Sequence, residues 1–212
     1  MTAVLFDLDG THVDSLPGIR GSLNRGLAAL GFPGHPPAAV RGFIGDGSWW
    51  LSRRALPASA PDSMVGVLEE HFKADYAQTW AAGTHPFPGI PELLAELADS
   101  AIPLAVLSNK PHPFTVEIVA TLFPGIPFAA VRGELSGTPR KPDPAGAIAI
   151  ARALRLDPAD ILFVGDSRVD SQTAASAGMP AAIVAWGYDD HAMPSAPHWC
   201  HDIPALRRAL TR

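Results

Sequence analysis

Five polar side chains follow short apolar runs of this sequence, where a parallel sheet would place its chemistry. They are Asp7 and Asp9 after residues 3–6, Ser108 after 103–107, Lys141 beyond 128–131, and Asp166 after 161–164. Apolar runs of this length, interleaved with helical patterns, are typical of buried parallel strands. Because ligands bind beyond the carboxyl ends of such strands, we expect these side chains to meet at one edge of one sheet.

The three carboxylates of this group would repel one another strongly at close range. One aspartate in such a place is often only a helix cap or a turn residue, but caps do not require several carboxylates that face each other. A divalent cation removes the repulsion, and oxygen ligands with few imidazoles favour Mg²⁺. Lys141 and Ser108 would then hold the oxygens of a phosphate group.

Four segments resemble, in order and in spacing, the four motifs of the haloacid dehalogenase-like (HAD) phosphohydrolases. They are Asp-Leu-Asp-Gly-Thr at 7–11, Ser-Asn at 108–109, Lys-Pro-Asp-Pro at 141–144, and Gly-Asp-Ser-Arg-Val-Asp at 165–170. One Asp-x-Asp pair is a weak signal. Four ordered motifs, spread over nearly the whole chain, are a specific one.

The resemblance implies a role for each acidic residue. Asp7 is expected to attack phosphorus as the nucleophile, and Asp9 to protonate the leaving alcohol and then to activate water. Mg²⁺ is expected on the Asp7 carboxylate, the backbone carbonyl of Asp9, and Asp166. True haloacid dehalogenases lack an aspartate at the position of Asp9, so its presence favours phosphoryl chemistry.

The resemblance also assigns residues around these carboxylates. Ser108, Asn109 and Lys141 are expected to bind the phosphoryl group as it is transferred. Asp170 is expected to orient the metal ligands without binding the metal itself, or to hold a metal-bound water. Thr11 is assigned to the same group of supporting residues.

The expected elements form an α/β fold. Strands are predicted at 3–6, 103–107, 128–131, 161–164 and 181–186, and helices at 92–99, 114–122, 144–154, 170–177 and 202–210. Strands that alternate with helices indicate a parallel sheet covered on both faces. With the resemblance, this implies a three-layer, doubly wound, Rossmann-like core made of residues 1–14 and 89–212.

Residues 15–88 contain no convincing strand and are assigned to an inserted, all-helical domain. Helices are predicted at 18–30, 48–56 and 62–80, with proline and glycine clustered between them. The insert falls between the first and second motifs, as does the helical cap of the first cap class in this family. The resemblance therefore implies a cap that closes over the site.

Within the insert, Arg-Gly-Phe-Ile-Gly-Asp-Gly at 41–47 is similar to the cap of phosphoglycolate phosphatases, which are members of this family. Glycines let a backbone approach a ligand, and a helix N-terminus favours an anion. Gly45, Gly47 and Arg53 are therefore assigned to substrate specificity. A plain corner between two helices is the alternative interpretation.

Several positions allow two interpretations. His12 stands where the family usually has leucine, and is either a polar residue at the edge of the core or a group that faces substrate. Lys110 could contact substrate or solvent. At least one of Trp49 and Trp50 is expected to pack in the core of the insert, and Arg168 either to be part of the loop structure or to pair with a nearby acid.

The composition argues against several other classes of protein. The net charge is −5, so a nucleic-acid or membrane-surface partner is not expected, and no apolar run approaches the roughly 18 residues of a membrane span. A single cysteine and the absence of a signal segment predict a cytoplasmic protein. Either a monomer or a homodimer is compatible with the pattern.

The expected function is that of a Mg²⁺-dependent phosphomonoesterase that acts on a small phosphate ester through a phospho-aspartate, with 2-phosphoglycolate as the first candidate. A phosphotransferase of the phosphoglucomutase type and a pyrophosphatase of the same superfamily are alternatives. A catalytically silent regulatory module is an alternative of another class, against which the intact acidic residues and Lys141 argue.

Overall fold

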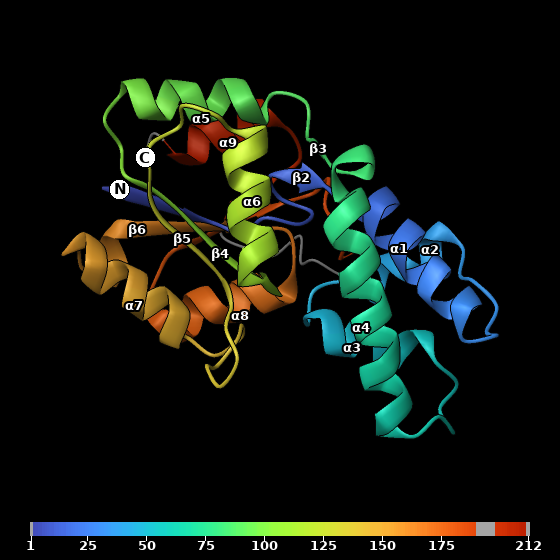
Figure 1. Ribbon diagram of the computed structural model, residues 1–212. Coiled ribbons are helices and arrows are strands. Elements are labelled where there is room, and N and C mark those ends of the chain that lie inside the picture. Colours follow the sequence, from blue (N-terminus) through green and yellow to red (C-terminus); the bar gives the residue numbers. More distant parts are fainter. Residues whose placement is uncertain (1, 190–197, 211–212) are drawn as a thin grey trace. The chain divides into compact units, whose positions relative to one another are not determined.

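The computed structural model describes residues 2–189 and 198–210 of the chain, and it divides into two units. The first, here called the α/β unit, comprises Met1–Val13 and Pro86–Arg212, and the second, the helical unit, comprises Asp14–His85 (Figure 1). These divisions lie within three residues of the boundaries that the sequence predicts.

A six-stranded sheet forms the middle of the α/β unit, in the order β5-β4-β1-β6-β7-β8. All five strand pairings are parallel. The strands are β1 (Ala3–Phe6), β4 (Leu104–Pro111), β5 (Phe128–Glu134), β6 (Ile161–Gly165), β7 (Ala181–Val184) and β8 (His198–Cys200). The first five correspond to the predicted strands, while β8 was not predicted because its three residues carry no apolar run.

Helices cover both faces of this sheet, as the fold class requires. In Figure 1, α5 (Ile90–Asp99) and α9 (Ile203–Leu210) lie on one face, and α7 (Ala145–Leu154) and α8 (Arg168–Ala177) lie on the other. Helix α6 (His112–Leu122) packs on β4 and β5, and a short 3₁₀ turn, η2 (Pro158–Asp160), leads into β6. The three-layer, doubly wound α/β fold predicted from the sequence is confirmed.

The alternation of side chains along each strand sends buried residues to both layers. Leu5 of β1, Leu107 of β4 and Phe163 of β6 share one hydrophobic cluster with Ile150 of α7 and Ala174 of α8. Strands β1, β4 and β6 are buried on both faces, which is why they begin as continuous apolar runs in the sequence.

The helical unit contains four α-helices and a 3₁₀ turn. They are α1 (Leu16–Ala29), α2 (Pro37–Arg41), α3 (Ser48–Ala55), α4 (Asp62–Thr79) and η1 (Trp80–Gly83). Helices α1 and α3 pack on α4. The five-residue helix α2 lies within a segment that the sequence suggested to be a loop, because it is too short to show helical periodicity.

Two short strands, β2 (Val13–Asp14) and β3 (His85–Pro86), form a separate two-stranded sheet where the chain passes between the units. Two-residue strands leave no periodic signal, so the sequence did not reveal them. Neither tryptophan at the start of α3 is fully buried: Trp49 is half-buried and Trp50 is 39% exposed, and the two rings meet edge to face. The expectation that one of them packs in the core is met only in part, by Trp49.

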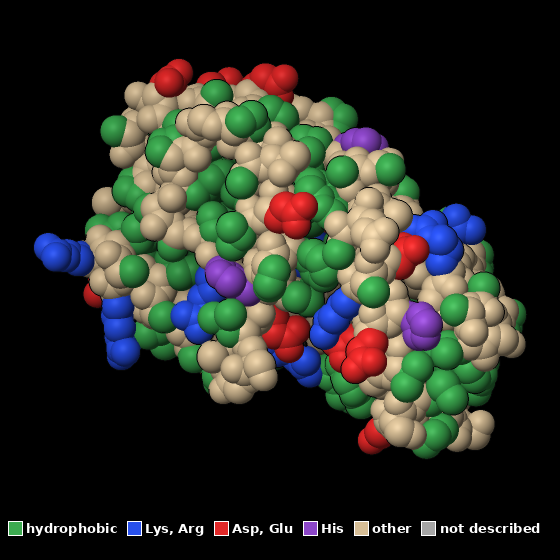
Figure 2. Space-filling model, in the orientation of Figure 1, with side chains coloured by type: hydrophobic (Ala, Val, Ile, Leu, Met, Phe, Trp, Pro, Cys, Tyr) green, Lys and Arg blue, Asp and Glu red, His purple; other side chains and the backbone are tan. Residues whose placement is uncertain are grey.

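Among the described residues, none of the helices combines the length and the apolar character that a membrane span needs. On the face of the molecule in Figure 2, lysine and arginine side chains are interspersed with acidic and apolar ones.

Candidate active site

The predicted site residues of the α/β unit lie at the carboxyl ends of its central strands. Asp7 directly follows β1, Ser108 and Asn109 lie near the end of β4, and Asp166 directly follows β6. Because β1 pairs with β4 on one side and with β6 on the other, these three strand ends are neighbours. The prediction that they share one edge of the sheet is confirmed.

Asp7 is 7% exposed, and its backbone N–H donates to the carbonyl of Val164 at 2.8 Å. This bond continues the pairing of β1 with β6 by one residue and fixes the direction of the side chain. Burial raises the pKa of the Asp7 carboxyl to about 7, with the charges of Asp170 and Asp9 raising it further and Lys141 lowering it.

Lys141 joins two of the carboxylates. Its buried Nζ donates to Oδ1 of Asp7 at 2.7 Å and to Oδ1 of Asp170 at 2.6 Å. Burial by itself lowers the pKa of Lys141, but the two carboxylates more than offset this and leave the pKa above its usual value. Lys141 is therefore a permanent cation at the base of the site.

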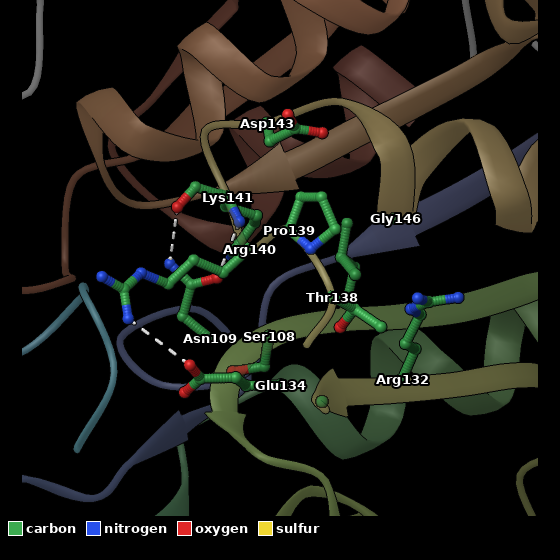
Figure 3. Close-up of a pocket in the computed structure, with 12 residues that line it drawn as sticks. Ser108, Asn109, Arg132, Glu134, Thr138, Pro139, Arg140, Lys141, Asp143 and Gly146 are labelled. Atoms are coloured by element: carbon green, nitrogen blue, oxygen red, sulfur yellow. Dashed lines mark hydrogen bonds and ion pairs between the residues drawn. The ribbon is translucent and has the colours of Figure 1, made fainter. Parts of the chain in front are cut away.

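Asn109 fixes the segment that carries Lys141. Its Nδ2 donates to the backbone carbonyl of Lys141 and its Oδ1 accepts from the backbone N–H of Lys141, both at 2.9 Å (Figure 3, dashed lines). The side-chain amide of Asn109 thus ties β4 to the loop after β5. Its assigned contact to phosphate would then fall to its backbone N–H, which stays a prediction.

Ser108 is 4% exposed, and its hydroxyl oxygen accepts the backbone N–H of Lys110 at 3.2 Å. Among the contacts described for this part of the chain, the hydroxyl donates no hydrogen bond. Its proton can therefore be given to an anionic oxygen, as the predicted phosphate contact requires.

Asp170 links Lys141 to the loop that carries Asp166 through hydrogen bonds. Its Oδ1 accepts from Lys141, while its Oδ2 accepts from the Ser167 hydroxyl at 2.6 Å and from the backbone N–H groups of Ser167 and Asp166 at 3.1 and 3.2 Å. The same carboxylate closes a capping box at the start of α8. These four donors give Asp170 a positioning part in the site, toward Lys141 and the Asp166 backbone.

Asp7, Asp166 and Asp170 each offer a carboxylate oxygen, and these three oxygens lie within 4.8 Å of one another. Burial raises the pKa of Asp166, with the charges of Asp170 and Asp7 adding to the effect. A buried group of hard oxygen donors with one compensating lysine fits a divalent cation such as Mg²⁺. All three carboxylates are candidates to hold it, and the assignment of Asp7 and Asp166 as the ligands stays a prediction.

Glycine is required next to Asp166. Gly10 has a φ of +83°, and a Cβ there would collide with the Asp166 carboxylate. The backbone turn after Asp9 is therefore open only to a residue without a side chain. The glycine of the first motif leaves the space in which the carboxylate of the fourth motif lies.

Thr11 and His12 are both fully buried, and neither side chain makes a described hydrogen bond to the carboxylates. The Thr11 hydroxyl and both ring nitrogens of His12 lack hydrogen-bond partners among the described residues. The His12 ring lies 4.5, 5.4 and 6.1 Å from the rings of Phe6, Phe123 and Phe128, and burial lowers its pKa to about 3. His12 is therefore a core residue, and the supporting role assigned to Thr11 stays a prediction.

Lys110 is the site residue whose partner the sequence analysis missed. The sequence suggested that Lys110 contacts substrate or solvent, but its Nζ contacts both carboxylate oxygens of Asp9, at 2.9 and 3.0 Å. The signal was available, because Asp9 and Lys110 each follow the buried core of a neighbouring strand and carry opposite charges. Arg168 pairs with Asp189 at 3.3 Å, so the expectation of a salt bridge there is confirmed.

The specificity residues assigned to the insert lie in the helical unit. Gly45 and Gly47 have positive φ angles of 121° and 87°, and Gly47 immediately precedes α3. The Arg53 guanidinium donates to the backbone carbonyls of Pro57 and Ala58, at 3.2 and 2.8 Å, and Arg54 pairs with Asp46. The two glycines therefore have backbone conformations that favour glycine, while the role of all three residues in specificity stays a prediction.

Comparison with known proteins agrees with this geometry. The model of the haloacid dehalogenase-like hydrolase family matches residues 4–184. A phosphoglycolate phosphatase of Yersinia pseudotuberculosis is 35% identical over 189 residues, covering 88% of this chain and 82% of that protein. One from Rhodospirillum rubrum is 37% identical over 193 residues, covering 88% and 80%.

Among solved structures, a predicted phosphoglycolate phosphatase from Haemophilus somnus superposes with a TM-score of 0.91 at 30% identity, and covers 100% of this chain and 98% of that one. The match in sequence extends over all four motifs, and the match in structure over both units. The chain belongs to the haloacid dehalogenase-like hydrolases.

Proposed function

We propose that this protein is a Mg²⁺-dependent phosphatase that hydrolyses 2-phosphoglycolate through a phospho-aspartate on Asp7. The observation that carries the proposal is the contact of Lys141 with Asp7 and Asp170, beside Asp166 and in a pocket that Ser108 also lines. A buried carboxylate held by a lysine, with oxygen donors for a cation at its side, is suited to attack an anionic phosphorus centre.

In the first half of the reaction, the free oxygen of the Asp7 carboxylate attacks phosphorus, and the bond from phosphorus to the ester oxygen breaks. The leaving oxygen takes a proton from Asp9. Lys141 and the Ser108 hydroxyl hold the phosphoryl oxygens while charge shifts between the attacking and leaving oxygens. A divalent cation held by Asp7 and Asp166 would supply positive charge that offsets the repulsion between the carboxylates and the phosphate.

In the second half, water attacks phosphorus and gives a proton to Asp9, now a carboxylate. The bond between phosphorus and the Asp7 oxygen breaks, which releases inorganic phosphate and restores Asp7. Asp9 thus donates one proton and recovers one in each cycle. This balance requires that its carboxylate occupy a similar place in both steps.

The substrate is proposed from the relatives. Proteins named phosphoglycolate phosphatase match 88% of this chain at 35% and 37% identity, and the positive-φ glycines before α3 occur in the segment that resembles their cap. No described observation favours the phosphotransferase, pyrophosphatase or silent-module alternatives. The cytoplasmic location, the monomeric or homodimeric state, and the lack of nucleic-acid and membrane partners remain predictions from the sequence.

A panel of phosphorylated metabolites, assayed for phosphate release with Mg²⁺, tests the proposal. We expect the highest kcat/KM for 2-phosphoglycolate, and loss of turnover in Asp7→Asn. Asp99→Asn is the matched control, because Asp99 is exposed at the end of α5, in the same unit. Full turnover by Asp7→Asn would refute the assignment of Asp7 as the nucleophile. A preference for another ester would refute 2-phosphoglycolate as the substrate. A wild-type protein that hydrolyses no member of the panel would refute the proposal that this protein is a phosphatase.

A further inference from the structure

Lys110 is buried at the end of β4, although it carries a charge. Its side chain is 5% exposed, and that of its partner Asp9 is 12% exposed. The two distances from Nζ to the Asp9 oxygens, 2.9 and 3.0 Å, are nearly equal. A buried ion pair of this geometry orients both oxygens of the carboxylate and not just one.

The backbone of Lys110 is held independently of Asp9. Its N–H donates to the Ser108 hydroxyl at 3.2 Å, and its carbonyl accepts from the Thr115 hydroxyl at 3.1 Å. On the neighbouring strand, a Cβ at Gly133 would collide with the Lys110 carbonyl and the Thr115 hydroxyl. The lysine therefore projects from a fixed point of the backbone, and its contacts with both carboxylate oxygens constrain the orientation of Asp9.

We propose that Lys110 is a positioning residue that holds the Asp9 carboxylate in one place for both of its proton transfers. The inference rests on the function proposed above, in which Asp9 first gives and then recovers a proton. Each carboxylate oxygen has two acceptor sites, so a lysine that contacts both oxygens can keep one site on each while the carboxylate exchanges a proton with the leaving oxygen and then with water. The positive charge also reduces the repulsion between Asp9 and an anionic substrate.

The two buried lysines of the site contact different carboxylates. Lys141 contacts Asp7 and Asp170, and Lys110 contacts Asp9. Lys141 therefore contacts the residue that forms the covalent bond with phosphorus, and Lys110 contacts the residue that transfers the proton. Loss of Lys110 should slow the step that depends most on proton transfer and spare the step that does not.

The experiment separates these steps with para-nitrophenyl phosphate, whose leaving group needs little protonation. Nitrophenolate release in a single turnover, with enzyme in excess, reports attack by Asp7. Multiple turnovers also require the hydrolysis step, in which Asp9 must accept a proton. For Lys110→Met we expect single-turnover release within about threefold of wild type, and kcat lower by on the order of 10-fold or more, because acid–base catalysis contributes about 10²–10⁴-fold in all.

Three further variants make the result specific. Lys110→Arg, which keeps the charge, should recover most of the lost kcat. Lys73→Met, which removes the partly exposed Lys73–Glu69 pair of α4, is the matched control and should leave kcat unchanged. In an Asp9→Asn background, Lys110→Met should add no further loss, because residues that act through one another are not additive.

The outcomes are distinguishable. Unchanged kcat in Lys110→Met overturns the inference, as does an equal fall of single-turnover release, which would place Lys110 on the phosphoryl group or on the fold of the Ser108 segment. A further loss in the Asp9→Asn background also overturns it. If Lys110→Met does not fold, as judged by circular dichroism, Lys110→Gln takes its place. A wild-type protein that releases no nitrophenolate at all would instead show the failure of the proposed function.

Discussion

Replacement of His12 by leucine should stabilise the protein and remove part of its sensitivity to acid. His12 is fully buried against Phe6, Phe123 and Phe128, and both ring nitrogens lack partners among the described residues. An unsatisfied buried polar group costs about 1–3 kcal/mol, and leucine removes it. Lost ring contacts, worth about 0.5–1.5 kcal/mol, reduce the gain, so we expect a net increase in the free energy of unfolding of about 1–2 kcal/mol at pH 7.

The pH dependence gives a sharper test. Burial lowers the pKa of His12 to about 3 from the ordinary 6.5, so below pH 6.5 the unfolded chain binds a proton that the folded chain does not. The wild-type protein therefore loses stability as pH falls from 6.5 toward 3, by about 1.4 kcal/mol for each pH unit. Over the interval from pH 6.5 to 5 this amounts to about 2 kcal/mol, and His12→Leu does not lose it.

Urea unfolding of both proteins at pH 7, 6 and 5, followed by circular dichroism, measures these differences. The advantage of His12→Leu should grow by about 2 kcal/mol between pH 7 and pH 5. His71→Leu is the matched control, because His71 is exposed on α4, where water reaches its ring nitrogens. An advantage that stays constant with pH would show that the ring is not held neutral in the folded protein, and a less stable variant at pH 7 would show that its nitrogens are satisfied.

Other parts of the site allow further predictions. Lys141→Met leaves the Asp7 and Asp170 carboxylates buried without their cation, and should destabilise the metal-free protein by about 3–5 kcal/mol in urea unfolding; a loss below about 1 kcal/mol, as at an exposed pair, would contradict the buried geometry. Gly10→Ala, which meets the Asp166 carboxylate at a positive φ, should weaken Mg²⁺ binding at least 10-fold in calorimetric titration; unchanged affinity would remove Asp166 from the metal site. Excess EDTA should abolish phosphate release and added Mg²⁺ restore it, and activity that persists in EDTA would contradict a metal-dependent site.

The sequence predicted the arrangement of the α/β unit because its signals are local. Strands β1, β4, β5, β6 and β7 each begin with an apolar run of four residues, and the central strands β1, β4 and β6 lead into polar residues of the site. The short elements were not predicted. Strand β8, helix α2 and the pair β2–β3 have two to five residues each, which is too few for periodicity to be seen, and their pairing depends on neighbours distant in the sequence.

Side-chain partners were harder to predict than the residues themselves. Asp7, Ser108, Lys141 and Asp166 follow from strand ends and motif spacing. The contact between Asp9 and Lys110 joins residues 101 positions apart, and it follows only once β4 is known to lie beside β1. The burial of His12 likewise depends on Phe123 and Phe128, which come from a distant segment.

The charges of the site explain why a divalent cation belongs there. Four carboxylates, those of Asp7, Asp9, Asp166 and Asp170, lie with two ammonium groups among the described residues. Lys110 neutralises Asp9, and Lys141 is shared between Asp7 and Asp170, which leaves two negative charges in a buried space. Protonation is one way to lower that charge, and burial accordingly raises the pKa of Asp7 and of Asp166. A protonated Asp7 cannot attack phosphorus, whereas one divalent cation balances both charges and keeps the nucleophile ionised at neutral pH.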